Sequence, residues 1–243
     1  FKKKIFSFPK PVSLLKELIK CSTENNDIIL DFFAGSSSSA HAIFETSTED
    51  KFDRRFIQIQ LPAKTDEKTE AFKAGYETLT EIGKERIRRA AKKIKEKNLD
   101  RAKNMDLGFK VFKLDSSNIK SWDGNPDELE SSLWDAVTNV KEDRSEEDVL
   151  YEILLKYGLD LTLPIEEKTI EELTVFNVGF GELFICLADN ITNKVAESIG
   201  KWKEDLNPKK CRVIFKDTGF TDVEKTNSVQ TLKRFGITEI KSI

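Results

Sequence analysis

The spacing of apolar residues divides the first half of the chain into alternating helices and short strands. The expected elements are helices over about 11–22, 38–45 and 76–97 and strands over 28–33, 54–61 and 108–115. The helices show apolar residues three or four positions apart, whereas the strands are short apolar or alternating runs. The first strand is apolar enough to suit the buried centre of a parallel sheet. The order strand–helix–strand–helix–strand predicts a parallel α/β sheet covered on both faces.

The second half of the chain continues with helices and strands in a unit of its own. The expected elements are helices over 125–140, 145–158, 193–206 and 222–235, a hairpin over 173–188, and strands over 211–217 and 237–243. A Ser-x-x-Asp pattern at Ser145 indicates a helix start, Gly158 a helix end, and Gly179–Gly181 a hairpin turn. The polar connector around 118–126 separates this unit from the first.

Composition indicates a globular protein. Of the 243 residues, 38% are hydrophobic and 34% are charged, which does not fit a disordered chain. No apolar run approaches the roughly 20 residues of a membrane helix, so we expect a cytoplasmic protein without a membrane partner. The chain opens on Phe1 and shows no signal peptide, so we expect a fragment or a trimmed chain.

Few residues offer metal or histidine chemistry. The three cysteines, Cys21, Cys186 and Cys211, lie far apart without C-x-x-C spacing, so we expect them reduced and packed inside. His41 is the single histidine, which argues against any mechanism that needs a histidine cluster. We expect His41 on a helix, packed near the loop that precedes it.

Charge is unevenly spread along the chain. Residues 84–103 hold ten Lys or Arg and three acids, a local charge of +7 in a chain of net charge −3. A basic segment in an acidic chain can contact nucleic acid. The alternative, a solvated helix face, is favoured on charge alone.

The stretch DIILDFFAGSSSSAHAIFE, residues 27–45, puts one glycine and four serines where the first strand turns into a helix. Parallel sheets bind ligands at this point, and small residues let backbone N–H groups approach the ligand. A phosphate-binding P-loop needs a second glycine and a lysine, which the stretch lacks. A serine-hydrolase elbow needs a closing glycine, which is also missing, and His41 shares a helix with the serines.

An adenosyl cofactor without phosphates is the third ligand considered. It requires backbone contacts at the first turn, an acid for its amino group, and a polar group for its ribose at the end of the second strand. Asp31 and Gln60 stand at those two places. The loop alone supports equally well a structural alternative, in which the serines only cap a helix and Asp31 is a turn residue.

Several motifs resemble one family. DFFAGSSSSAHA resembles the D-[PF]-F-x-G-S-G-T-T segment that binds S-adenosylmethionine in amino-methylating DNA methyltransferases, and FSFPKPVSLL resembles the motif just before it. RRFIQIQLP is similar to the second-strand motif of the adenine-specific modification subunits of type III restriction–modification systems. Further similar segments are GYETLTEIGKERIRRA, GFKVFKLDSSNIKSW, DVLYEILLKYGLDLTLPI and RVIFKDTGFTDVEKTNSVQTLKRFGI. The resemblance covers nearly the whole chain.

The resemblance implies S-adenosylmethionine as the cofactor. The implied contacts are Phe8 and Lys10 at the methionine end, Asp31 at the amino group, Phe33, Gly35 and Ser36 at the backbone turn, and Gln60 at the ribose. Asp115, at the end of the third strand, either faces the adenine ring or is a solvated strand end. Trp122 and Trp134 are expected to anchor the core. No catalytic residue and no metal ligand is assigned.

Two departures from the family pattern affect function. Ser37 replaces the loop's second glycine, which costs little at ordinary dihedral angles but of order 1 kcal/mol or more if φ is positive, and its side chain can crowd the ligand. The D-P-P-Y motif is absent. In the family it holds the adenine amino group and stacks on the flipped base. In the family the motif lies upstream of the cofactor loop, on the far half of a circularly permuted sheet, and the target-recognition region also lies upstream. The chain therefore resembles the C-terminal part of a modification subunit.

The expected fold class is therefore α/β. Residues 1–118 are expected to form a Rossmann-like, partly parallel sheet, half of an S-adenosylmethionine-dependent methyltransferase fold, and 119–243 a smaller α/β C-terminal domain. The resemblance implies adenine N6-methylation of DNA by the complete subunit, with a restriction subunit as partner and a homodimer as assembly. The alternative is a non-catalytic assembly module for dimerisation or restriction-subunit binding. Cofactor binding by the chain distinguishes the two.

Overall fold

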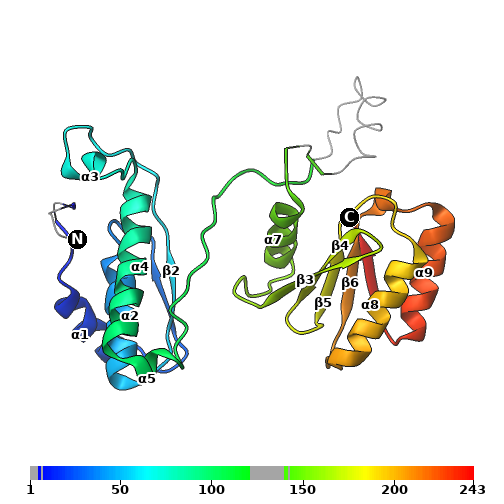
Figure 1. The fold of residues 1–243 in the computed structure, drawn as a ribbon, viewed down its shortest axis with the longest axis horizontal. Coiled ribbons are helices and arrows are strands. Elements are labelled where there is room, and N and C mark those ends of the chain that lie inside the picture. Colours follow the sequence, from blue (N-terminus) through cyan, green and yellow to red (C-terminus); the bar gives the residue numbers. More distant parts are fainter. Residues whose placement is uncertain (1–4, 7, 121–139, 142) are drawn as a thin grey trace. The chain divides into compact units, whose positions relative to one another are not determined.

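The chain forms two compact units, Phe1–Val111 and Phe112–Ile243. The computed structural model describes residues 5–6, 8–120, 140–141 and 143–243 (Figure 1). Trp122, Trp134 and all but the last residue of the helix expected over 125–140 lie outside the described residues.

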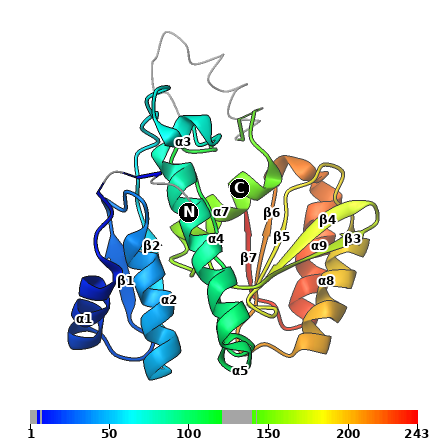
Figure 2. The same ribbon diagram turned by 60° about the vertical axis from the view of Figure 1, so that its left-hand side comes forward.

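The first unit alternates helices and strands as the sequence predicts. Its elements are α1 Val12–Ser22, β1 Ile28–Asp31, α2 Ser38–Asp50, β2 Arg55–Gln58, α3 Glu70–Lys73, α4 Leu79–Lys97 and α5 Leu99–Ala102. The strands β1 and β2 pair in parallel, with Asp31 opposite Gln58. From these strands, Ile29 and Phe56 join cores built mainly by α1, α2 and α4 (Figure 2). This packing places the carboxyl ends of both strands beside the start of α2.

The opposite face of this small sheet is exposed within the first unit. Ile28, Leu30, Ile57 and Ile59 alternate with the covered residues, and each is about half exposed. The expectation of a fully buried first strand with helices on both faces is therefore wrong for this unit. The physical reason is that its described helices pack against one face only. A bare apolar face of this kind is typical of a surface that another element covers.

The expected third strand over 108–115 is also wrong, because this segment has no regular secondary structure. Its apolar alternation leaves Leu114 fully exposed. Instead, Phe112 packs on Tyr151, with ring centroids 4.8 Å apart, and Asp115 Oδ2 accepts a hydrogen bond from Arg144 Nη1 at 2.9 Å. A strand needs a neighbour for its backbone groups, and no described strand lies beside this segment. From residue 112 onward it belongs to the second unit.

The second unit is a five-stranded mixed sheet between two layers of helices. Its elements are α7 Glu146–Lys156, β3 Ile165–Ile170, β4 Leu173–Val178, β5 Leu183–Cys186, α8 Asn193–Leu206, β6 Arg212–Phe215, the short 3-10 helix η2 Asp217–Gly219, α9 Asp222–Arg234 and β7 Glu239–Ser242. The strand order is β3-β4-β5-β6-β7, antiparallel from β3 to β5 and parallel from β5 to β7. One core joins the sheet to α8 and α9, and the other joins it to α7.

Most expected features of the second unit are confirmed. The capping box at Ser145 forms with Asp148, Gly158 adopts a positive φ, and the β4–β5 hairpin turns at Gly179–Gly181. The strand β3 was not expected from the sequence. Cys186 is buried and Cys211 is half-buried, but Cys21 is exposed near the end of α1, contrary to expectation. None of the described helices combines the length and apolar character needed to cross a membrane.

Candidate functional site

The serine loop between β1 and α2 contains two residues in the left-handed conformation. Gly35 has φ +54° and Ser37 has φ +55°, so Ser36 is flanked by two left-handed residues. Glycine adopts this conformation without a steric penalty, whereas serine does not. Because the φ of Ser37 is positive, serine at this position costs of order 1 kcal/mol or more relative to glycine. The side chains of Ser36, Ser37 and Ser38 are all buried, although their polarity alone would suggest exposure.

Hydrogen bonds tie this loop to the end of β2. The Gly35 N–H donates to Gln60 Oε1 at 2.7 Å, the Ala34 N–H donates to the Ile59 carbonyl at 3.2 Å, and the Ser37 N–H donates to the Ala34 carbonyl at 2.7 Å. Gln60 also donates through Nε2 to the Leu61 carbonyl at 3.0 Å. The structure thus brings Gly35 and Gln60 together, with both ends of the Gln60 amide engaged.

Asp31 lies in a second polar cluster beside the loop. Its carboxylate accepts hydrogen bonds from the Ser39 hydroxyl at 2.5 Å and from the Phe33 N–H at 3.2 Å. Ser39 and the Gln58 side-chain amide also lie within hydrogen-bond distance of each other. Neither Ser39 nor Gln58 was assigned from the sequence. The alternation in I-Q-I-Q could have suggested Gln58, because it puts Gln58 and Gln60 on one face of the strand.

The expected aromatic and basic contacts near the loop are only partly assembled. Phe33 is 82% exposed, and its ring lies 5.1 Å from that of Phe32. Phe8 is 85% exposed, and Lys10 is also exposed. The residue next to Gly35 is instead Phe6, whose Cζ lies 3.6 Å from the position that a Cβ on Gly35 would take. Phe6 belongs to the same F-S-F-P-K segment but was not assigned from the sequence.

The helix α4 packs directly against the serine loop. A Cβ on Gly83 would stand 2.7 Å from Ser37 Oγ and 3.5 Å from the Gly35 carbonyl oxygen. One turn further along, Arg86 Nη1 donates to Ser36 Oγ at 3.0 Å. Burial lowers the pKa of the Arg86 guanidinium. Among the described residues, no carboxylate lies within ion-pair distance of Arg86. Neither Gly83 nor Arg86 was assigned from the sequence.

His41 is a helix residue near the loop, as expected. Its Nε2 lies 3.1 Å from Glu45 Oε1, and its Nδ1 is buried without a hydrogen-bond partner among the described residues. Burial lowers the pKa of His41, with a smaller opposing effect of Glu45. Asp115 is exposed in the second unit, and its carboxylate pairs with Arg144.

The cluster fits the shape demands of an adenosyl ligand in two respects. The left-handed Gly35 lets backbone lie close to a ligand at the carboxyl end of β1, where a side chain would intrude. The apolar side chains of Phe32, Phe33 and Leu61 are exposed at the ends of both strands and offer surface to an aromatic ring. Among the described residues, no three His, Cys, Asp or Glu side chains come together as metal ligands.

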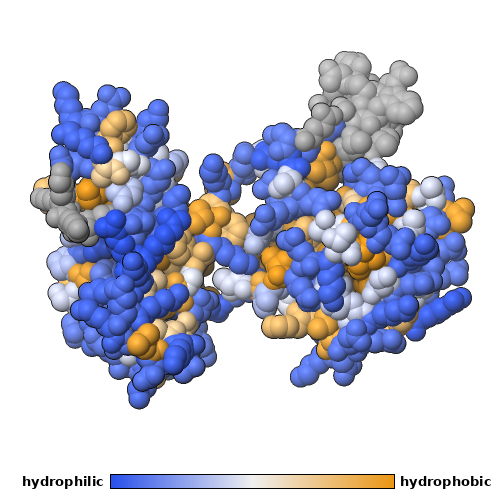
Figure 3. All heavy atoms as spheres, viewed as in Figure 1, coloured by the Kyte–Doolittle hydropathy of each residue, from blue (hydrophilic) through white to orange (hydrophobic). Residues whose placement is uncertain are grey.

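A basic, open groove lies between α4 and residues 107–109. Its lining combines cationic residues of α4 with an apolar floor: Arg88, Ala91, Lys92, Lys95, Leu107, Gly108 and Phe109. The Arg88 guanidinium stacks over the Phe109 ring at 5.7 Å from its centroid. Figure 3 shows hydrophilic residues over much of this unit. The charge suits phosphate groups, and the openness suits an extended polyanion better than a small ligand.

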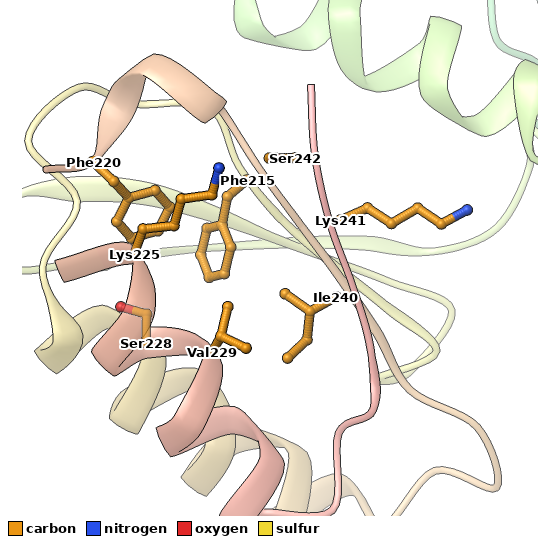
Figure 4. A pocket seen from close by; sticks show the side chains of 8 residues that line it. All are labelled: Phe215, Phe220, Lys225, Ser228, Val229, Ile240, Lys241 and Ser242. Atoms are coloured by element: carbon orange, nitrogen blue, oxygen red, sulfur yellow. The ribbon is translucent and has the colours of Figure 1, made fainter. Parts of the chain in front are cut away.

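The second unit contains a small pocket. A pocket of about 70 Å³ lies between β6, α9 and β7 (Figure 4). Its lining is mostly apolar and includes Phe215, Phe220, Val229 and Ile240. Sites for drug-sized ligands usually measure roughly 300–1,000 Å³. The pocket is therefore too small for an adenosyl cofactor.

Comparisons with known proteins agree with the geometry of the first unit. The family N6_N4_Mtase, described as DNA methylase, matches residues 2–49. That segment contains α1, β1, the serine loop and nearly all of α2. By this match, residues 2–49 are similar to DNA methylases.

Three similar proteins are Mod subunits of type III restriction-modification enzymes. The chain is 30% identical over 240 residues to the Mod subunit of the type III restriction-modification enzyme EcoPI of Escherichia phage P1, which covers 96% of the chain and 35% of that protein. It is 29% identical over 233 residues to the Mod subunit of the type III restriction-modification enzyme EcoP15I of Escherichia coli. This alignment covers 95% of the chain and 34% of that protein. It is 44% identical over 109 residues to the Mod subunit of the type III restriction-modification enzyme StyLTI of Salmonella typhimurium. This alignment covers 45% of the chain and 16% of that protein.

The chain belongs to the family of type III modification subunits and corresponds to a part of such a subunit. It spans about a third of the length of the two relatives that match nearly all of it.

Proposed function

We propose that this chain is the C-terminal part of an adenine N6-specific DNA methyltransferase and supplies its S-adenosylmethionine-binding motifs. The observation that carries the proposal is the hydrogen bond from the Gly35 N–H to Gln60 Oε1, which joins the serine loop to the second-strand motif. The family relationship supports the same assignment. Residues 1–118 would hold the cofactor, and the cellular location would be the cytoplasm.

Each residue of the cluster has a defined task in this proposal. Asp31 accepts hydrogen bonds and is suited to the cofactor's amino group, while Ser39 donates to the Asp31 carboxylate and is itself within hydrogen-bond distance of the Gln58 amide. Gln60 reaches the ribose after exchanging one of its two amide contacts. Phe33, Gly35 and Ser36 form the turn, and Phe8 and Lys10 close over the methionine end. The bound cofactor supplies the methyl group that the adenine amine attacks in line.

The chain alone should transfer no methyl group to DNA. It lacks the D-P-P-Y motif, so it has no group to orient the adenine amine or to stack on the flipped base. The exposed apolar face of the β1–β2 sheet supports this reading, because an upstream half of the sheet with its helices would cover it. Cofactor binding by the chain should be weak or absent for the same reason.

Tritiated methyl transfer to mixed-sequence duplex DNA tests the proposal. The chain is assayed alone and together with a co-expressed N-terminal part of a complete type III modification subunit. Activity that requires mixing supports the proposed division of the subunit. Activity of the chain alone would contradict it, because the missing motif would then be dispensable.

A second candidate function is assembly. The second unit closes two hydrophobic cores of its own, and this self-contained packing suits an interaction role for 119–243. It would support a homodimer or bind the restriction subunit of the same system. Sedimentation of the full chain at increasing concentration tests dimerisation. Lack of methyl transfer both alone and on mixing would favour this candidate.

A further inference from the structure

We propose that Arg86 is a positioning residue that fixes the conformation of the cofactor loop through the hydroxyl of Ser36. The inference rests on the proposed function, because it assigns to α4 a role in holding the cofactor site. It starts from the position of Ser36 between two left-handed residues, Gly35 and Ser37. A left-handed serine is strained, and such strain persists only where surrounding contacts hold it.

The contacts that hold the loop come from two directions. On one side, Gln60, which follows β2, accepts a hydrogen bond from the Gly35 N–H at 2.7 Å. From α4, Arg86 donates to Ser36 Oγ at 3.0 Å, and Gly83 leaves room for the Ser37 side chain. Ser36 is 3% exposed, so its hydroxyl relies on the protein for a hydrogen-bond partner. Arg86 Nη1 provides it at 3.0 Å, and the Ser38 hydroxyl is a second, longer contact at 3.4 Å.

Arg86 differs in its surroundings from other arginines of the first unit. Arg54 pairs with Asp50 at 2.8 Å, and Arg101 pairs with Asp53 at 3.0 Å. Arg86, by contrast, has no carboxylate within ion-pair distance among the described residues, and its contact is a neutral hydroxyl. Burying part of a guanidinium against a neutral partner costs free energy. The contact that the structure gives the Arg86 guanidinium is therefore the buried hydroxyl of the loop, which links α4 to the loop conformation.

Amide hydrogen exchange of the full 243-residue chain provides the test. Arg86→Gln removes the charge and should raise exchange of the Gly35 and Ser37 amides about tenfold, because the loop loses a charge-assisted hydrogen bond. Ser36→Ala should have the same effect, and the double variant should add little. Arg86→Lys should retain most of the protection, because its ammonium can donate to the same hydroxyl. Lys92→Gln is the matched control, since Lys92 is an exposed cation on the same helix.

Equal loop exchange in Arg86→Gln and Lys92→Gln would overturn the proposal, as would additive effects of Arg86→Gln and Ser36→Ala. S-adenosylmethionine titration, followed by NMR at the loop amides, separates this inference from the proposed function. Weaker S-adenosylmethionine binding by Arg86→Gln than by Lys92→Gln supports both the positioning role of Arg86 and the cofactor assignment. If no variant binds the cofactor while the exchange pattern holds, the positioning role of Arg86 stands, and the cofactor assignment is decided by methyl transfer on mixing with the N-terminal part. If the loop amides of Arg86→Gln exchange faster but its cofactor affinity is unchanged, the proposal that Arg86 supports the cofactor site is overturned.

Discussion

Gly83 and Ser37 are matched across the contact between α4 and the serine loop. A Cβ on Gly83 would stand 2.7 Å from Ser37 Oγ, a distance that real Cβ contacts essentially never show. Where the family pattern has a glycine, this chain therefore has a serine whose hydroxyl occupies the space left by a glycine on the neighbouring helix. The crowding caused by Ser37 falls, at least in part, on α4.

Substitutions at these two positions should not be additive. Ser37→Gly relieves a left-handed serine and should raise the free energy of unfolding of the first unit by about 0.5–1 kcal/mol. Gly83→Ala in the unaltered chain should cost about 1–3 kcal/mol through overpacking. In the Ser37→Gly background, the cost of Gly83→Ala should fall below about 1 kcal/mol, because the clashing hydroxyl is gone. Urea unfolding of the four chains measures the coupling, and strict additivity would contradict the contact.

The bare face of the β1–β2 sheet should drive self-association. Leu30→Thr changes a side chain that is 55% exposed on this face, so it should alter stability by less than about 1 kcal/mol and reduce association in sedimentation experiments. Ile29→Thr is the matched control on the opposite face, where it packs against the core. It should cost roughly 1–3 kcal/mol and leave association driven by the bare face in place. Equal effects of the two variants would contradict the assignment of faces.

Glu152 should make the second unit sensitive to acid. Burial raises its pKa, but hydrogen bonds from Lys156, Ser117 and the Asn118 N–H outweigh burial and lower the pKa to about 2. The ionised form stabilises the fold at neutral pH, and this contribution is lost as pH falls from the unfolded value near 4.5 through about 2.

Glu152→Gln should therefore destabilise the chain at pH 7 by of order 1 kcal/mol after allowance for solvent screening, and by much less at pH 2. Thermal unfolding at a series of pH values gives the measurement. Glu147→Gln, an exposed glutamate of α7, serves as the control. A destabilisation by Glu152→Gln that is independent of pH would show that the carboxylate charge is not involved.

The basic groove on α4 should bind DNA through phosphates without sequence preference. The double change Lys92→Glu and Lys95→Glu should weaken binding at least tenfold, and the salt dependence of binding should become less steep. The same reversals at Lys209 and Lys210, exposed lysines of the second unit, provide a charge-matched control. Fluorescence anisotropy with two unrelated duplexes at several salt concentrations checks this. A sequence-selective complex that ignores salt would contradict it.

Elements with local end signals could be predicted well from the sequence. The helix α8 has the expected bounds, Asn193–Leu206, and α7 begins at the predicted cap, Ser145. Failures concern elements that depend on distant partners. The alternating segment 108–115 has the pattern of a strand but no neighbouring strand, whereas β3, with the polar sequence I-E-E-K-T-I, is a strand because β4 pairs with it. Pairing across the chain is not encoded in either segment alone.

The candidate site shows the same limit. Gly35, Asp31 and Gln60 could be placed from the sequence because they stand at strand ends and turns, where position along the chain fixes position in the sheet. Gly83 and Arg86 could not, because they look like ordinary residues of an amphipathic basic helix. Their contacts with Ser37 and Ser36 arise only when α4 packs beside α2.

In the second unit, the spatial order of the strands is also their order along the chain, from β3 to β7. Each new strand can therefore add to the edge formed by the strand before it, starting from the two hairpins and continuing through the parallel additions of β6 and β7. No strand has to insert between two others that are already paired. Contacts between consecutive elements keep loop-closure entropy low, so refolding of this unit should proceed as stepwise growth of one sheet edge, with β7 docking last.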